Sequence, residues 1–170
     1  MKKILVVLFA LSITLCGHSQ NRAHKKADKQ MREWRYELEC AGIGQDGTYL
    51  LKVWCYSKKP SVAAEHAKKN AVHGVIFKGF TGAQGCTSQK PLTNDVNLEQ
   101  EKADFFDPFF EDGGKYMKFV NCTSDGVPDA NSCIKVGKEY KVGIIVSVAK
   151  DALRKDLEQA GIVKGLSSGF

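Results

Sequence analysis

The chain has 170 residues, with 25 Lys and Arg against 19 Asp and Glu, which gives a formal net charge of +6. Residues 20–35 contain six of these basic residues against two acidic ones, whereas from Tyr36 onward there are 17 of each sign. The net positive charge is therefore concentrated in an N-terminal arm, and the rest of the chain is neutral overall. This distribution argues against a broadly basic surface that binds nucleic acid.

The N-terminus has the order of a secretory signal peptide: two lysines, an apolar run from residue 4 to residue 15, and then small and polar residues. The run is about a dozen residues long, well short of the roughly 20 that span a bilayer as a helix, so the mature protein is not expected to be transmembrane. Gly17 and Ser19 predict cleavage after residue 19. A lipoprotein anchored through Cys16 is the alternative, although Leu15 is bulkier than lipoprotein cleavage prefers.

We therefore assign residues 1–19 to the signal peptide, residues 20–33 to a basic arm and residues 34–170 to a single α+β domain, and we expect the protein to be periplasmic or extracellular. Basic side chains near an anionic surface contribute about 1 kcal/mol each, so the arm is suited to contact lipid headgroups or lipopolysaccharide phosphates. The alternative is that the arm is a solvated segment that binds no surface. The basic residues of the arm are Arg22, Lys25, Lys26, Lys29 and Arg32.

Five cysteines follow the signal peptide, so at least one of them is unpaired or pairs between molecules. Export permits disulfide formation. Cys122 and Cys133 flank a stretch rich in turn-forming residues, which brings the ends of the stretch together. This pattern predicts a Cys122–Cys133 disulfide at the neck of a hairpin loop.

Two other cysteines belong to the first predicted hairpin, whose turn sets Cys40 opposite Leu51 and Cys55 opposite Tyr36. In that register the two cysteines lie roughly 13 Å apart along the strands. A disulfide needs Cα atoms within about 7 Å, so Cys40 and Cys55 are not expected to bond to each other. Either of them is a candidate partner for Cys86, and the pairing of Cys40, Cys55 and Cys86 stays open. No cysteine pair has zinc-site spacing, and neither a metal nor another cofactor is predicted.

Alternation of apolar and polar residues predicts the first strand from Trp34 to Cys40 and the second from Tyr49 to Tyr56. A helix from about residue 61 to residue 78 follows. Apolar residues recur in it every four positions, at Ala63, Ala67, Ala71 and Val75. Such a stripe of small residues lets a helix lie close on a sheet.

A second helix is predicted to start near Asn97 and to end in a cluster of phenylalanines around Pro108. The cluster comprises Phe105, Phe106, Phe109 and Phe110. Apolar clusters usually fill a core, and we expect these side chains to lie under the helix. The alternative is an exposed docking patch, which a monomer rarely tolerates.

Two further strands are predicted at Lys115–Cys122 and Ile134–Val148, and a closing helix at residues 150–160 is stopped by Gly161. The order of elements is hairpin, helix, helix, hairpin, helix. This order predicts an α+β fold in which an antiparallel sheet of about four strands, arranged as two hairpins, has helices packed on one face.

No motif assigns catalytic residues: the sequence contains no Gly-x-Ser-x-Gly and no His-Glu-x-x-His. His66 and His73 lie seven apart on the predicted helix without an evident third metal ligand. These observations favour an exported, non-catalytic envelope module that binds a protein or an envelope glycan through its sheet face or its arm. The alternative is a small periplasmic enzyme acting on envelope material, with a concave site near residues 79–90.

The alanine-rich helix carries a resemblance to a known family through Ala64, Ala67, Asn70, Ala71, Val72 and the segment Ile76–Gly79. Together with the strand that begins at Val53, it resembles the strand-to-helix core of the N-terminal domain of flagellar assembly protein T and related surface lipoproteins. Val142 to Ile162 fit its later part. The missing lipobox, the extra cysteines and the Phe cluster depart from that pattern. The resemblance implies a non-catalytic envelope or assembly role and carries over no functional residue.

Overall fold

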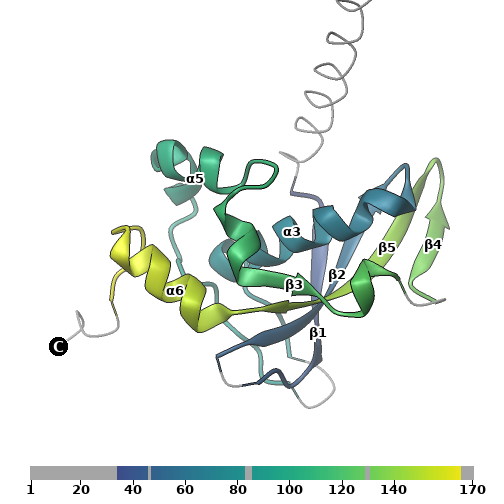
Figure 1. Cartoon of the computed structure of the whole chain (residues 1–170), viewed down its shortest axis with the longest axis horizontal. Helices are drawn as coiled ribbons and strands as arrows, with labels where there is room; N and C mark the ends of the chain where they lie inside the picture. Colours follow the sequence, from purple (N-terminus) through teal and green to yellow (C-terminus); the bar gives the residue numbers. More distant parts are fainter. Residues whose placement is uncertain (1–33, 46, 83–85, 129–130, 166–170) are drawn as a thin grey trace, which may run out of the picture. The chain divides into compact units, whose positions relative to one another are not determined.

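The computed structural model describes residues 34–45, 47–82, 86–128 and 131–165 (Figure 1). The predicted signal peptide and the five basic residues assigned to the arm lie outside the described residues. The elements from Tyr36 onward belong to one compact unit. In chain order they are β1 (Tyr36–Gly42), β2 (Tyr49–Ser57), the 3-10 turn η1 (Pro60–Val62), α3 (Ala63–Phe77), α4 (Leu98–Glu101), α5 (Ala103–Phe109), η2 (Lys115–Phe119), β3 (Val120–Cys122), η3 (Ser124–Gly126), β4 (Cys133–Val136), β5 (Glu139–Val148) and α6 (Lys150–Gln159).

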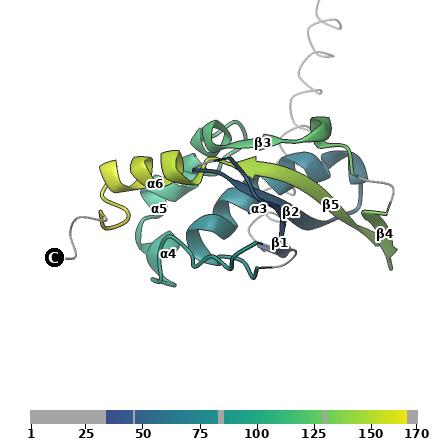
Figure 2. The ribbon, with the colours of Figure 1, turned by 90° about the horizontal axis from the view of Figure 1, so that it is seen from below.

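The strands form one antiparallel sheet in the order β1-β2-β5-β3, and β4 also pairs with β5. Strand β2 pairs with one edge of β5. The other edge of β5 pairs with β4 near the start of β5 and with β3 near the end of β5. Figure 2 shows α3 lying along one face of this sheet. The predicted α+β fold, with an antiparallel sheet and helices on one face, is confirmed.

The register of the first hairpin is the predicted one. Cys40 lies opposite Leu51 and Tyr36 opposite Cys55, with a bulge between Cys40 and Gly42. The alternation of β2 then directs Leu51, Val53 and Cys55 into the interior, where each is almost fully buried.

The core lies between the inner sheet face and α3. All four members of the predicted stripe, Ala63, Ala67, Ala71 and Val75, are buried. Gly74 lies where the helix passes β1, and a Cβ added to it would come within 3.2 Å of Tyr36 Cε2 and closer still to the Leu38 side chain. A small residue is therefore required there for α3 to pack this closely on the sheet.

The second half of the sheet differs from the two long strands that the sequence predicts. Residues 115–119 form the 3-10 helix η2, because Tyr116 and Phe119 are buried three positions apart, which is the 3-10 period. The predicted single strand Ile134–Val148 is instead a hairpin, β4 and β5. Gly137, with a φ of 61°, and the next residue form the two-residue turn between them.

The Phe cluster belongs to the core. Phe106, Phe109 and Phe110 have exposed fractions of 1%, 2% and 5%, and Phe105 is half-buried. The buried three follow the i, i+3, i+4 spacing of one helix face, and they contact one another and the rings of Phe119 and Tyr116. The interaction-surface alternative for Phe106, Phe109 and Phe110 is therefore wrong, since these side chains lie in the core, whereas Phe105 is only half-buried.

The predicted Cys122–Cys133 disulfide is also wrong, since both residues are free thiols. Cys122 lies opposite Val146 and Cys133 opposite Val142 on the same strand. Four residues of strand separate these positions, roughly 13 Å, which is beyond the reach of a disulfide. The turn-rich stretch between them does not close on itself but carries the chain from β3 to β4.

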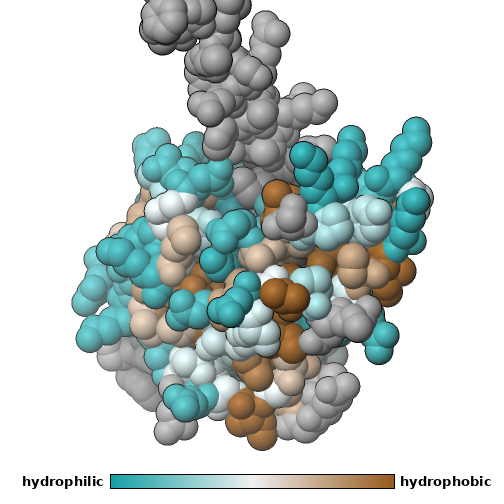
Figure 3. Space-filling view, turned by 45° about the vertical axis from the view of Figure 1, so that its right-hand side comes forward, coloured by the Kyte–Doolittle hydropathy of each residue, from teal (hydrophilic) through white to brown (hydrophobic). Residues whose placement is uncertain are grey.

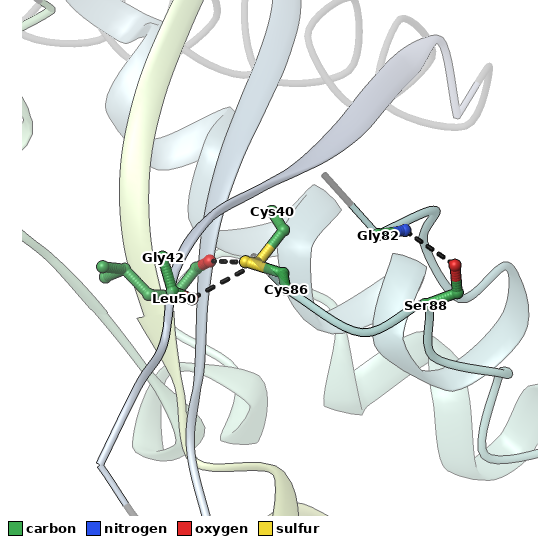
Figure 4. The surroundings of a disulfide bond; sticks show 6 residues. All are labelled: Cys40, Gly42, Leu50, Gly82, Cys86 and Ser88. Atoms are coloured by element: carbon green, nitrogen blue, oxygen red, sulfur yellow. Dashed lines mark hydrogen bonds between the residues drawn. A yellow bond between two sulfur atoms is a disulfide. The ribbon is translucent and has the colours of Figure 1, made fainter. Parts of the chain in front are cut away.

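A disulfide within the described residues joins Cys40 of β1 to Cys86, with their Cα atoms 6.2 Å apart (Figure 4). It attaches the segment between α3 and α4 to the edge strand. The Cys40 sulfur lies 3.3 Å from the carbonyl oxygen of Gly42 and 3.8 Å from that of Leu50. Nearby, the Gly82 amide donates to the Ser88 hydroxyl at 2.8 Å.

Among the described residues, no helix has both the length and the hydrophobicity needed to cross a membrane. On the face drawn in Figure 3, hydrophobic residues form small groups between hydrophilic ones. Isolated exposed apolar side chains, of which Ile43 and Val96 are the most exposed, are normal on a protein surface.

We predict that replacing both bridged cysteines, Cys40→Ser with Cys86→Ser, lowers the free energy of unfolding by about 4 kcal/mol, because the chain-entropy model assigns this value to a cross-link between residues 46 apart. Urea unfolding measures the change. Cys133→Ser serves as the control, since its exposed side chain should alter stability by about 0.5 kcal/mol or less. Peptide mapping that recovers a Cys122–Cys133 bridge instead would contradict the pairing.

We predict that Phe106→Ala lowers the free energy of unfolding by about 3–5 kcal/mol, because it leaves a cavity among packed rings. Phe105→Ala is the matched control on the same helix and should cost about 1–2 kcal/mol, since its side chain is half-buried. Equal losses for the two variants in chemical denaturation would argue against the burial described above.

Candidate functional site

The sheet face opposite α3 carries a group of aromatic and charged side chains. We call it the outer face, and its central residues are Glu37, Glu39, Lys52, Trp54, Tyr56, Lys141, Gly143 and Ile145. They alternate with the buried residues of β1, β2 and β5, so strand geometry directs them away from the core. Helix α3 lies on the other face of the sheet.

Trp54 is the centre of the outer face. In the register of the sheet it lies between Glu37 of β1 and Gly143 of β5. A Cβ added to Gly143 would approach Trp54 Cζ3 and Cε3 to 3.0 and 3.1 Å, so the glycine makes room for the benzo ring of the indole over the backbone of β5. The pairing of a tryptophan with a glycine on adjacent strands thus positions the ring on the sheet.

Two lysines approach the Trp54 ring. Lys52 Nζ lies 4.7 Å and Lys141 Nζ 5.1 Å from the ring centroid, which is within the range of a cation–π contact. The indole Nε1 of Trp54 is enclosed and has no hydrogen-bond partner among the described residues. An enclosed donor without an acceptor is unusual in a folded protein and costs free energy.

Glu37 connects the other polar groups of the outer face. Its two carboxylate oxygens accept hydrogen bonds from the Tyr56 hydroxyl at 3.0 Å and from Lys141 Nζ at 2.7 Å. The hydrogen bond from Lys141 lowers the pKa of Glu37, and the same bond raises the pKa of Lys141. Both groups are therefore charged at neutral pH. Their pair holds the Lys141 side chain beside the Trp54 ring.

A second candidate site lies along β1, near the region where the sequence placed a concave site. A groove of about 390 Å³ is lined by Tyr36, Leu38, Lys78, Gly79, Phe80, Thr81, Gln89, Lys90 and Pro91. A smaller groove of about 270 Å³ beside the disulfide shares Phe80 and Gln89 with it. Among the described lining residues of the first groove, the titratable side chains are those of Tyr36, Lys78 and Lys90.

The walls of these grooves are held together by hydrogen bonds and by a close backbone approach. The backbones of Phe80 and Gln89 exchange hydrogen bonds of 3.0 and 2.9 Å, and the Tyr49 hydroxyl donates to Gln89 Oε1 at 2.8 Å. Gly79 has a φ of 67°, and a Cβ there would overlap the Gln89 carbonyl oxygen. The backbone conformation and the close approach at Gly79 thus permit only glycine at this position.

A buried hydrogen-bonded network joins β1, α3 and α4. The Tyr36 hydroxyl lies 2.6 Å from His73 Nδ1, and His73 Nε2 lies 3.3 Å from Glu99 Oε2. These distances fit a neutral imidazole that accepts from Tyr36 and donates to Glu99. Burial is the main cause that lowers the pKa of His73, against the opposing effect of Glu99, and burial also raises the pKa of Tyr36.

The network gives His73 a structural role in place of the metal-ligand role weighed from the sequence. Burial also lowers the pKa of His66. Among residues 34–45, 47–82, 86–128 and 131–165, no group of three or more His, Cys, Asp or Glu side chains is placed to hold a metal ion. The Cys55 thiol is not an activated nucleophile, because burial raises its pKa to about 12.

Sequence reasoning named the sheet face as a binding surface, and the alternation of the predicted second strand puts Lys52, Trp54 and Tyr56 on one face, but it did not identify their neighbours on the other strands. The missing information is the pairing of β2 with β5, which brings Gly143 and Lys141 beside Trp54. A glycine among the outward residues of the predicted fourth strand was the one available signal.

Comparison with known proteins adds no relative: no family model, no curated protein and no solved structure matches the chain. The resemblance to the N-terminal domain of flagellar assembly protein T therefore stays a prediction.

We predict that the free energy of unfolding decreases as the pH falls below about 6.5, the ordinary pKa of histidine, because the unfolded chain then binds a proton that buried His73 resists. His73→Gln removes this contribution, so the stability difference between wild type and variant should shrink from pH 8 to pH 5. Chemical denaturation across this range measures it. A constant difference would contradict the lowered pKa.

Proposed function

We propose that the chain is an exported, non-catalytic module of the bacterial cell envelope that binds its partner, a protein or an envelope glycan, on the outer face of its sheet. The observation that carries this proposal is the placement of Trp54 over Gly143 beside Lys52 and Lys141. Tryptophan and tyrosine dominate the binding energy of many recognition surfaces because they offer large contact areas with a polar handle.

The Cys40–Cys86 disulfide supports the exported location. Structural disulfides form and persist in oxidising compartments such as the periplasm and the cell exterior. This agrees with the signal peptide predicted from the N-terminal sequence. An attachment through Cys16 would place the same domain on a membrane surface and leave the outer face with the same residues.

The enzyme alternative would use the groove along β1. Hydrolysis of envelope material requires convergent acid and base groups or an activated nucleophile. The described lining residues of this groove include no carboxylate and no histidine, and the Tyr36 hydroxyl is directed at buried His73. The groove is better suited to hold a ligand than to cleave one, and binding is the function that the geometry supports best.

We predict that Trp54→Ala reduces binding to bacterial envelope fragments about tenfold, as expected for the loss of a central interface aromatic. Co-sedimentation of the purified mature protein with the fragments measures the bound fraction. Tyr140→Ala is the matched control, because strand alternation directs Tyr140 to the opposite sheet face. If folded Trp54→Ala binds as well as wild type, the outer face is not the binding surface.

A further inference from the structure

We propose that the ligand of the outer face is an uncharged glycan, with one sugar ring packed against the Trp54 indole and its hydroxyl groups bound by the flanking charged side chains. The inference rests on the proposed function and names the partner class of that same surface. Three features of the outer face carry it: the composition around Trp54, the balance of charge and the unpartnered indole nitrogen.

The first feature separates a glycan from a protein partner. The core of a protein–protein interface is depleted of Lys and Glu. Here charged residues directly adjoin the central aromatic: Glu37 is the cross-strand neighbour of Trp54, and the lysine Nζ atoms lie over its ring. Such a surface is poorly suited to an apolar protein patch. It is well suited to a ligand whose rings have apolar C–H faces and hydroxyl edges.

The second feature separates an uncharged glycan from a polyanion. Around Trp54 the outer face carries two lysines, Lys52 and Lys141, and two glutamates, Glu37 and Glu39. Lys141 is already paired with Glu37 at 2.7 Å. A polyanion would meet two carboxylates beside the two ammonium groups. Hydroxyl groups, which both donate and accept, match carboxylate acceptors and ammonium donors equally well.

The third feature is a hydrogen-bond donor that a ligand would satisfy. Trp54 Nε1 is enclosed and has no acceptor in the part of the chain that the structure describes. The Lys52 and Lys141 ammonium groups lie 4.7 and 5.1 Å from the ring centroid on long, flexible side chains, so a sugar that displaces one of them gains access to the indole ring. The displaced ammonium group remains close enough to donate to a ligand hydroxyl. The strands themselves need not move, because Gly143 already provides space for the indole.

The test uses the mature protein and soluble oligosaccharides of uncharged β-linked N-acetylglucosamine, β-glucan, α-glucan, galactan and mannan, with polygalacturonate as the polyanion. Isothermal titration calorimetry measures each dissociation constant. At least one neutral oligosaccharide should bind with a dissociation constant below about 1 mM, in the range of weak specific complexes. Trp54→Ala should weaken this binding at least tenfold and Tyr140→Ala less than twofold. Trp54→Phe, which retains an aromatic ring, should weaken binding by a factor between those of the other two variants.

Salt provides the second readout. Binding of an uncharged glycan should change less than twofold between 50 and 500 mM NaCl, whereas binding that depends on ion pairs weakens steeply over this range. Tighter binding of polygalacturonate than of every neutral oligosaccharide would overturn the inference, and so would the absence of neutral binding. If envelope binding nevertheless requires Trp54 and is destroyed by protease treatment of the fragments, the partner is a protein. The proposed function then stands while this inference fails.

Discussion

The pairing of β2 with β5 is the constraint on which both faces of the sheet depend. The two strands are matched residue by residue from Tyr49–Val148 to Ser57–Tyr140. Because side chains alternate along a strand, the same register that buries Val53 against Ile144 sets Trp54 against Gly143 on the outer face. A slip of one residue would send the tryptophan into the core and a valine to the surface. The burial of the valines therefore also fixes the position of the candidate site.

The edge strand β1 is held in place by three different interactions. Close packing of α3 at Gly74 brings the helix onto Leu38, the buried network joins Tyr36 to His73, and the disulfide at Cys40 attaches the segment that follows α3. Edge strands expose unpaired backbone groups and pair readily with other chains. Here the isolated bridge between Glu39 and Thr81 occupies part of that edge. The same contacts keep Glu37 beside Trp54, since Glu37 lies between Tyr36 and Leu38 on the strand.

Local patterns in the sequence were sufficient for the first hairpin and for α3, because a short turn sets the hairpin register and a four-residue repeat sets the buried helix face. These patterns were not sufficient to predict that Cys122 and Cys133 remain unpaired. The turn-rich stretch between Cys122 and Cys133 predicts a closed loop, whereas the two cysteines join β5 at positions four residues apart. The exclusion of Cys40–Cys55 used the same strand arithmetic and was correct, because there both strands were identified. The sequence named the sheet face as a binding surface but did not predict the β5 neighbours of Trp54 on it, because these lie on a strand that is distant in sequence.

The outer face combines a fixed aromatic ring with movable charges, and this division suits recognition of a hydroxyl-rich ligand. The ring position follows from the strand register and Gly143, so little conformational entropy is lost when a ligand packs against it. Lys52 contacts the ring through a flexible side chain, whereas Lys141 is restrained by Glu37. Exposed ion pairs of this kind contribute little to stability. Their value lies in arranging donors and acceptors around the indole, and this charge-balanced arrangement is the one that the proposed binding of a hydroxyl-rich ligand requires.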